Sequence, residues 1–319
     1  MEPWRFTYRA LGTCAAVAML SGCGAQSGAA LPRSLLTGPS AAAAPQPASK
    51  PYNGAYLYAS GDASGYVLTY PSGKLVGTIS GTALGTCSDA GGNVYFGEVR
   101  QVAEFAHGGT TPSATYPVPG TAAACSVDPT TGNLAVVVFC LTGCGDEVAI
   151  FPPGAGTAPI AYKDSKLTQL LFCTYDDRGN LFVDGYKSNK FAIAELPANG
   201  NALADIAFKK NIQTAYQIQW DGKYLAVQTR VDPVIYQIQV SGSTARVVNV
   251  VKFSNIGHRS TQAWIQKDKI AFPSTVNRRP ESVLVFAYPA GGKPIDVVKG
   301  FIGGGHQQLD GVTFSVNPR

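Results

Sequence analysis

The stretch that decides the fold is CTYDDRGNLFV at residues 173–183. It joins a short first segment, an acidic turn, a Gly-Asn pair and a second, very apolar segment. Gly supplies the positive φ that a hairpin turn requires, and Asn tolerates the left-handed region better than most residues. A segment that is apolar at every position suits a strand with neighbours on both faces. The stretch therefore predicts a hairpin whose second strand is buried between sheets.

The same pattern recurs along the chain. Further copies are CSDAGGNVYF at 87–96, CSVDPTTGNLAV at 125–136, IQWDGKYLAV at 218–227 and WIQKDKIAF at 264–272. The second strands start at intervals of 40, 47, 43 and 46 residues, at Val94, Leu134, Leu181, Tyr224 and Ile270. A third strand and a more polar fourth strand follow, as at 148–151 and 246–251. Four antiparallel strands in a repeat of this length are typical of one β-propeller blade.

The two ends of the repeat region complement each other. Residues 54–58 match a second strand with no first strand before them, and residues 310–318 match a first strand with nothing after it. Pairing them gives a sixth blade and removes the exposed sheet edges of an open ring. We therefore predict an all-β, six-bladed β-propeller, closed by pairing of the C-terminal strand with the N-terminal blade. A seven-bladed ring is the rival, but it needs a repeat that the sequence does not show.

Over residues 54–319 the chain resembles NHL-like and related six-bladed propellers. It looks most like uncharacterised bacterial propeller lipoproteins that carry similar Cys-x-x-Asp…Gly-Asn-Leu repeats. The resemblance implies an architecture and brings no catalytic residues with it, because propellers host many unrelated functions.

The first 22 residues look like a bacterial lipoprotein signal. Arg5 and Arg9 precede an apolar segment at 10–20, whose 11 residues are too few to span a bilayer. The motif LSGC at 20–23 then resembles a lipobox, in which the signal is cleaved and Cys23 is acylated. The resemblance implies an extracytoplasmic protein anchored to membrane lipid through Cys23. Gly24 stands where Asp would favour the inner membrane, so we expect the outer membrane or cell surface; the alternative is an ordinary cleaved signal.

Composition divides the rest of the chain in two. Residues 23–51, from the lipidated Cys onward, are rich in Ala, Ser, Gly and Pro and are expected to form a flexible tether, whereas 52–319 form the propeller domain. Removal of the signal lowers the net charge from +5 to +4, and no basic run is present. Nucleic-acid binding is therefore unsupported.

The cysteines allow several pairings. Cys140 and Cys144 flank three residues of a loop, so we predict a disulfide there in an oxidising compartment, with two free thiols as the alternative. Cys87, Cys125 and Cys173 are taken to hold equivalent positions in successive inner strands. Equivalent positions point the same way around the ring, and sheets stack about 10 Å apart. We therefore expect no disulfide among these three, and interpret them as small buried hydrophobes rather than a metal or redox site.

Five residues are candidates for ligand binding at one mouth of the central channel. His258 and His306 precede inner strands, and Arg100, Arg230 and Arg278 lie in loops between second and third strands. A solvated loop face is the interpretation that the sequence favours for them. The functional alternative is a shallow, basic pocket for a small anionic or sugar-like ligand.

The sequence favours a binding or scaffold module over an enzyme. It contains no Gly-x-Ser-x-Gly elbow, His-Glu-x-x-His motif or phosphate loop, and we assign no catalytic residue, metal ligand or cofactor. We expect a monomer that binds a small ligand or an envelope protein. A divalent-cation-dependent lactonase or other hydrolase is the alternative function, because oxygen ligands around a channel leave no short motif.

The anchoring prediction is tested by Cys23→Ser. We expect the unaltered chain, expressed in a bacterium, to partition into detergent and to carry acyl mass, because two or three acyl chains give stable membrane binding. The variant should move to the aqueous phase. An unaltered protein that stays in buffer without acyl mass would contradict the lipoprotein assignment.

Overall fold

The computed structural model describes residues 52–139, 145–164, 166–231, 234–256, 261–274, 282–302 and 308–317. These ranges fold into β-strands, and they contain no helix with the length and apolarity needed to cross a membrane. The strands are β1 Ala55–Gly61, β2 Ser64–Tyr70, β3 Leu75–Ser80, β4 Gly85–Ser88, β5 Val94–Phe105, β6 Ala114–Val127, β7 Leu134–Phe139, β8 Glu147–Phe151, β9 Ile160–Tyr162, β10 Gln169–Tyr175, β11 Leu181–Lys187, β12 Lys190–Leu196, β13 Ala204–Phe208, β14 Ala215–Trp220, β15 Leu225–Thr229, β16 Val234–Ser241, β17 Thr244–Lys252, β18 Trp264–Gln266, β19 Lys269–Ser274, β20 Ser282–Ala287, β21 Asp296–Val298 and β22 Leu309–Ser315.

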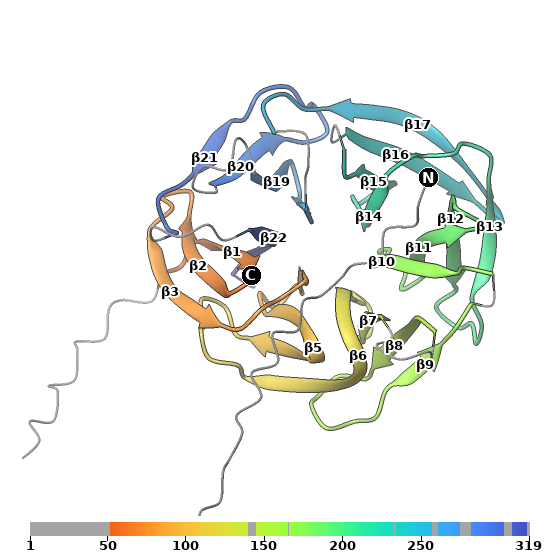
Figure 1. The fold of residues 1–319 in the computed structure, drawn as a ribbon, viewed down its shortest axis with the longest axis horizontal. Coiled ribbons are helices and arrows are strands. Elements are labelled where there is room, and N and C mark those ends of the chain that lie inside the picture. The colour runs from red at the N-terminus through yellow and green to blue at the C-terminus, as the bar shows by residue number, and fades with distance from the viewer. Residues whose placement is uncertain are drawn as a thin grey trace, which may run out of the picture. The chain divides into compact units, whose positions relative to one another are not determined.

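The last strand lies beside the first. β22 pairs antiparallel with β1, with Tyr56 opposite Ser315 and Ala59 opposite Val312. Figure 1 shows β22, in blue, next to β1, in orange. β1 continues to β2 and β2 to β3, so this sheet has the order β22-β1-β2-β3. The predicted pairing of the C-terminal strand with the N-terminal strands is therefore confirmed.

The other sheets follow the repeat, but some of them merge. β18 to β21 form a four-stranded sheet, and β4 to β9 form a six-stranded sheet. β10–β13 and β14–β17 join into one eight-stranded sheet through parallel pairing of β13 with β17, where Ala207 lies opposite Thr244. This pairing covers two outer strands that would otherwise present open edges.

Two long strands each supply two strands of the repeat. Phe96 and Phe105 both belong to β5, yet their ring centroids are 5.4 Å apart. In a continuous strand they would be separated by about 30 Å. The chain therefore turns back within β5, at Arg100, which has a φ of 66°. β6 likewise pairs with β5 through its first half and with β7 through its second half, which contains Cys125.

The first strand of each repeat lies innermost. β22 contacts β4, β4 contacts β6, β6 contacts β10, β10 contacts β14, and β18 contacts β22. Side-chain hydrogen bonds join β14 to the β18 segment. Figure 1 shows these strands around a central axis, with the later strands of each repeat farther out. We call them the inner strands; for β6 the term applies to its second half.

An aspartate organises the turn after an inner strand. Oδ1 of Asp176 accepts hydrogen bonds from the backbone N–H of Arg178 and of Asn180, each at 2.9 Å. Oδ2 of Asp176 accepts a third from Nδ2 of Asn180 at 2.8 Å. Gly179 has a φ of 80°, as predicted for the turn, whereas Asn180 is not in the left-handed region. The Asn of the repeat therefore acts through its side-chain amide. The corresponding aspartates are Asp89, Asp128 and Asp221.

The second strands form the core. Every side chain of β15 is buried, and so are all of those in β7 except Phe139. One hydrophobic cluster contains buried residues from Ala124 to Ile238, on neighbouring strands of several repeats. The prediction that the second strands are apolar because they lie between sheets is therefore confirmed.

The Asp176 carboxylate should contribute to the stability of the fold. Asp176→Ala should lower the free energy of unfolding by about 2–3 kcal/mol, because the buried Asp176 carboxylate is the acceptor for two backbone N–H groups of the turn. Asp177→Ala removes the same charge from an exposed neighbouring side chain, so it should change the free energy by less than about 0.5 kcal/mol. Urea unfolding of both variants makes the comparison, and equal effects would refute the role of Asp176.

Candidate functional site in the axial channel

Of the five predicted ligand-binding residues, the structure describes Arg100 and Arg230. Arg100 is exposed at the tip of the hairpin within β5. His258, His306 and Arg278 lie outside the described residues, as do Cys23, Cys140 and Cys144. The basic pocket that is the functional alternative for these residues therefore stays a hypothesis.

Arg230, just after β15, interacts with an aromatic ring and with a carboxyl group of the propeller. Its guanidinium carbon lies 5.1 Å from the centroid of the Tyr216 ring, at cation–π distance. Its charge also acts on Asp310 of β22, whose pKa is raised to about 6 chiefly by burial. A hydrogen bond from Gln308 and the positive charge of Arg230 oppose this rise, while Asp62 adds to it. Arg230 thus compensates a half-buried carboxyl near the start of the closing strand.

A cavity of about 710 Å³ lies on the axis. Its lining comes from five inner strands and includes Ser88, Ser126, Thr174, Gln219 and Ile265. The cavity is at the ends of the inner strands where the aspartate turns lie, because Tyr175 and Asp177 line it whereas the start of β10 does not. It therefore lies at the mouth opposite to the one at which the sequence places the candidate ligand-binding residues.

The lining combines acidic and aromatic side chains. It contains the carboxylates of Asp89, Glu104, Asp128 and Asp177, and none of its residues is Lys, Arg or His. The aromatic residues of the lining are Tyr95, Tyr116, Phe172, Tyr175, Trp220 and Trp264. Trp220 and Trp264 are only partly buried and border the cavity.

Two tyrosine–carboxylate pairs, from the turn after β4 and from β5 and β6, line the cavity. The Tyr116 hydroxyl donates a hydrogen bond to Oε2 of Glu104 at 2.7 Å. The Tyr95 hydroxyl lies 3.3 Å from Oδ2 of Asp89, and the two tyrosine rings are 6.3 Å apart. Burial is the main cause that raises the pKa of both tyrosines, and the nearby carboxylates raise it further. Both phenols are therefore neutral donors at physiological pH.

One position of the repeat links each inner strand to the next. It lies two residues before the turn aspartate. Oγ of Ser126 accepts a hydrogen bond from the backbone N–H of Tyr175 at 3.0 Å. Oγ1 of Thr174 accepts one from the backbone N–H of Trp220 at 2.8 Å. These hydroxyls satisfy backbone groups on the strand edge that faces the axis.

Glutamines make the corresponding links farther along the chain. The Gln219 amide accepts from Ile265 N–H at 2.7 Å and donates to Ile265 C=O at 2.9 Å. Gln217 does the same with Ala263, at 2.8 and 2.7 Å. Because side chains two residues apart in a strand share one face, the two amides bind alternate peptide groups, as a neighbouring strand would.

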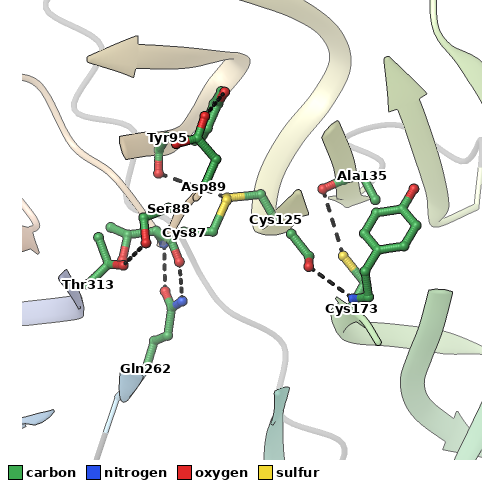
Figure 2. Close-up of a disulfide and its surroundings, with 12 residues drawn as sticks. Cys87, Ser88, Asp89, Tyr95, Cys125, Ala135, Cys173, Gln262 and Thr313 are labelled. Carbon is green, nitrogen blue, oxygen red and sulfur yellow. Dashed lines mark hydrogen bonds between the residues drawn. A yellow bond between two sulfur atoms is a disulfide. The ribbon is translucent and has the colours of Figure 1, made fainter. Parts of the chain in front are cut away.

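A third glutamine passes over the closing strand. Oε1 of Gln262 accepts a hydrogen bond from Thr86 N–H at 2.6 Å, and its Nε2 donates to Thr86 C=O. A Cβ on Gly311 of β22 would lie 2.7 Å from that Oε1, so only glycine leaves room for the amide. Figure 2 shows Gln262 against the backbone beside Cys87.

The remaining link is a disulfide between β4 and β6, which the sequence analysis had excluded. Cys87 and Cys125 are bonded, with their Cα atoms 5.6 Å apart (Figure 2). That Cα separation is within the range of bridged cysteines. The separation of about 10 Å between stacked sheets does not hold for these two strands, because neighbouring sheets converge where their inner strands meet at the axis. The expectation of three unpaired cysteines was therefore wrong.

A one-residue offset makes this pairing possible. Cys87 is two residues before its turn aspartate, whereas Cys125 and Cys173 are three residues before theirs. Accordingly Cys87 pairs with the second residue of its second strand, Tyr95, and Cys125 with the third, Val136. A shift of one residue turns a strand side chain to the other face, so Cys87 and Cys125 face each other. This offset was visible in the sequence.

Cys173 is buried with a free thiol. Its Sγ lies 3.8 Å from Ala135 O, so it points back toward the preceding repeat, as Cys125 does (Figure 2). Burial raises its pKa, and the charge of Asp184 raises it further, so the thiol is protonated. Over the described ranges, no group of three or more His, Cys, Asp or Glu side chains is placed to hold a metal ion.

The fold is similar to that of known propellers. A protein of unknown function from Bacteroides caccae has 11% identity and a TM-score of 0.62, with 82% of this chain and 99% of that chain covered. A chain of a nidogen/laminin complex has 14% identity and a TM-score of 0.59, with 83% and 100% covered. The Myceliophteria thermophila Cps50 (Swd1) β-propeller domain has 10% identity and a TM-score of 0.51, with 77% and 83% covered.

These similarities establish a β-propeller fold and, at such low identity, nothing about function. No protein-family model matches the sequence, and no curated protein is similar to it.

The disulfide in the channel wall should contribute to stability. It closes a loop with a sequence separation of 38 residues, which corresponds to about 3–4 kcal/mol through the reduced entropy of the unfolded chain. We expect Cys87→Ala/Cys125→Ala to lower the free energy of unfolding by that order. Protein that is unfolded, reduced and refolded in reductant should lose a similar amount, and the double variant should respond far less, because only the predicted Cys140–Cys144 pair, which closes a much shorter loop, could then be reduced. A wild-type protein indifferent to reduction would contradict this.

Proposed function

We propose that this protein is an extracytoplasmic lipoprotein whose six-bladed β-propeller binds a small ligand in the axial cavity. The main observation in support of binding is the cavity of about 710 Å³, which opens among the aspartate turns and is lined by side chains from five inner strands. A cavity of this size fits a small organic molecule, and concave sites with aromatic walls and a few polar groups are the usual form of such binding sites.

Six blades are supported by the order of the inner strands. Each of β22, β4, β6, β10, β14 and β18 is linked to the next, and β18 contacts β22 again. The closing pairing of β22 with β1 supplies the blade that the two chain ends share.

The extracytoplasmic location is supported by two independent features. The LSGC motif at 20–23 is typical of a lipidated N-terminus. The disulfide between Cys87 and Cys125 is of a kind that persists in oxidising compartments and is rare in the cytosol. A tether of residues 24–51 would hold the propeller away from the membrane.

Binding rather than catalysis is supported by how the polar groups of the channel are used. The hydroxyls of Ser126 and Thr174 and the amides of Gln217, Gln219 and Gln262 are hydrogen-bonded to neighbouring strands. These contacts fix the wall of the cavity and occupy groups that could otherwise act on a substrate.

The test uses a bulky side chain at the rim. Ala155 is exposed and lines the cavity, whereas Ala198 is exposed in a turn that does not. We expect members of a set of amines, sugars, amino acids and carboxylates to raise the melting temperature of the full-length protein by about 2 °C or more. Ala155→Phe should abolish this shift by narrowing the cavity, and Ala198→Phe should keep it. The proposal fails if no compound shifts the wild type, or if Ala155→Phe responds like the wild type.

A further inference from the structure

The charge of the cavity differs from that of the whole chain. The protein has 25 Lys and Arg against 20 Asp and Glu, so its net charge is +5. The lining of the cavity nevertheless contains four carboxylates and no basic side chain. A lining drawn at random from this chain would be expected to contain both acidic and basic side chains. The cavity is therefore unsuited to an anion, and the resulting negative potential attracts cations.

The turn aspartate Asp128, which lines the cavity, keeps its charge. Burial alone would raise the pKa of Asp128, but hydrogen bonds from the hydroxyls of Thr131 and Thr130 and from the Thr130 backbone together lower it. Asp128 is therefore ionised at neutral pH although its oxygens also hold its turn in place. Asp177 is exposed at the same rim.

The interior offers aromatic surface more than hydrogen-bonding groups. The amides of Gln217, Gln219 and Gln262 each bind both polar groups of a neighbouring peptide. A sugar needs many such partners and would find them occupied. Trp220 and Trp264, by contrast, are partly exposed to the cavity. Aromatic faces with nearby carboxylates are the typical surroundings of a bound ammonium group.

We propose that the axial cavity binds an organic cation: a primary or quaternary ammonium group attached to a small apolar body. The ammonium group would lie among the carboxylates that line the cavity, which include Glu104 and Asp177, and the apolar body against Trp220 and Trp264. This inference rests on the proposed binding role of the cavity and specifies its ligand class.

Tryptophan fluorescence can report on the cavity alone. The chain has three tryptophans, Trp4, Trp220 and Trp264, and the last two line the cavity. The proposed cleavage before Cys23 removes Trp4, so in the mature protein we would titrate benzyltrimethylammonium, benzyl alcohol, benzoate and cellobiose. We expect saturable quenching or a spectral shift with benzyltrimethylammonium, weaker binding of benzyl alcohol, and none of benzoate or cellobiose. The affinity for the cation should fall as NaCl is raised, because screening weakens the carboxylate contribution.

The carboxylates are tested with a charge-matched pair of double variants. Glu104→Gln/Asp177→Asn removes two lining charges, and the amide oxygen introduced at the first of these positions still accepts a hydrogen bond from the Tyr116 hydroxyl. Asp62→Asn/Asp268→Asn removes two exposed charges outside the cavity. We expect the first pair to weaken cation binding about tenfold, because two carboxylates near solvent attract a bound cation only moderately. The second pair, farther from the ligand, should leave binding within about twofold. Unchanged melting temperatures would show that both pairs are folded.

Several results would overturn the inference. Equal losses in the two double variants would show that the cation responds to net charge and not to the cavity. If cellobiose or benzoate binds and benzyltrimethylammonium does not, an organic cation is rejected as the ligand. The cavity would then still have a binding role. If no probe changes the fluorescence, the cation proposal falls, and the wider compound set with Ala155→Phe decides separately whether the cavity binds anything.

Discussion

The structure depends on how the axis-facing edge of each inner strand is satisfied. An inner strand pairs with its second strand on one side, but on the other side the next inner strand is not placed to continue the ladder. Its backbone N–H and C=O groups would then be buried without partners, at a cost of about 1–3 kcal/mol each. Side chains supply the missing bonds: hydroxyls at Ser126 and Thr174, and amides at Gln217, Gln219 and Gln262.

This solution also determines the chemistry of the channel. The position two residues before the turn aspartate points toward the next repeat in every case, whether it holds Cys87, Ser126, Thr174 or Gln219. The same geometric requirement is met by a covalent bond, by a hydroxyl or by an amide. Because these groups are used between strands, the rest of the cavity lining includes tryptophan and tyrosine side chains and four carboxylates.

Much of the fold was predictable because its signals are local. The Gly-Asn turns, the fully apolar second strands and the spacing of the repeats identify hairpins without reference to distant residues, and the matching chain ends predict the closing pair. The hairpin within β5 gives a weaker signal, because its positive φ is at Arg100 and not at a glycine. The site was less predictable because its contacts are distant in sequence: Gln219 and Ile265 are 46 residues apart, and Gln262 binds Thr86 at a separation of 176. The disulfide was not predicted because Cys87, Cys125 and Cys173 were assumed to occupy equivalent positions in their strands. Counting back from the turn aspartates shows instead that Cys87 is offset by one residue.

The pairing of β22 with β1 has a consequence for biogenesis. A ribosome makes β1 first and β22 last, and Ser60 and Gly311, which meet in the finished sheet, are 251 residues apart. Until the final residues emerge, β1 has an unpaired edge that can associate with other chains. Folding of the whole ring is therefore completed only after β22 has been synthesised.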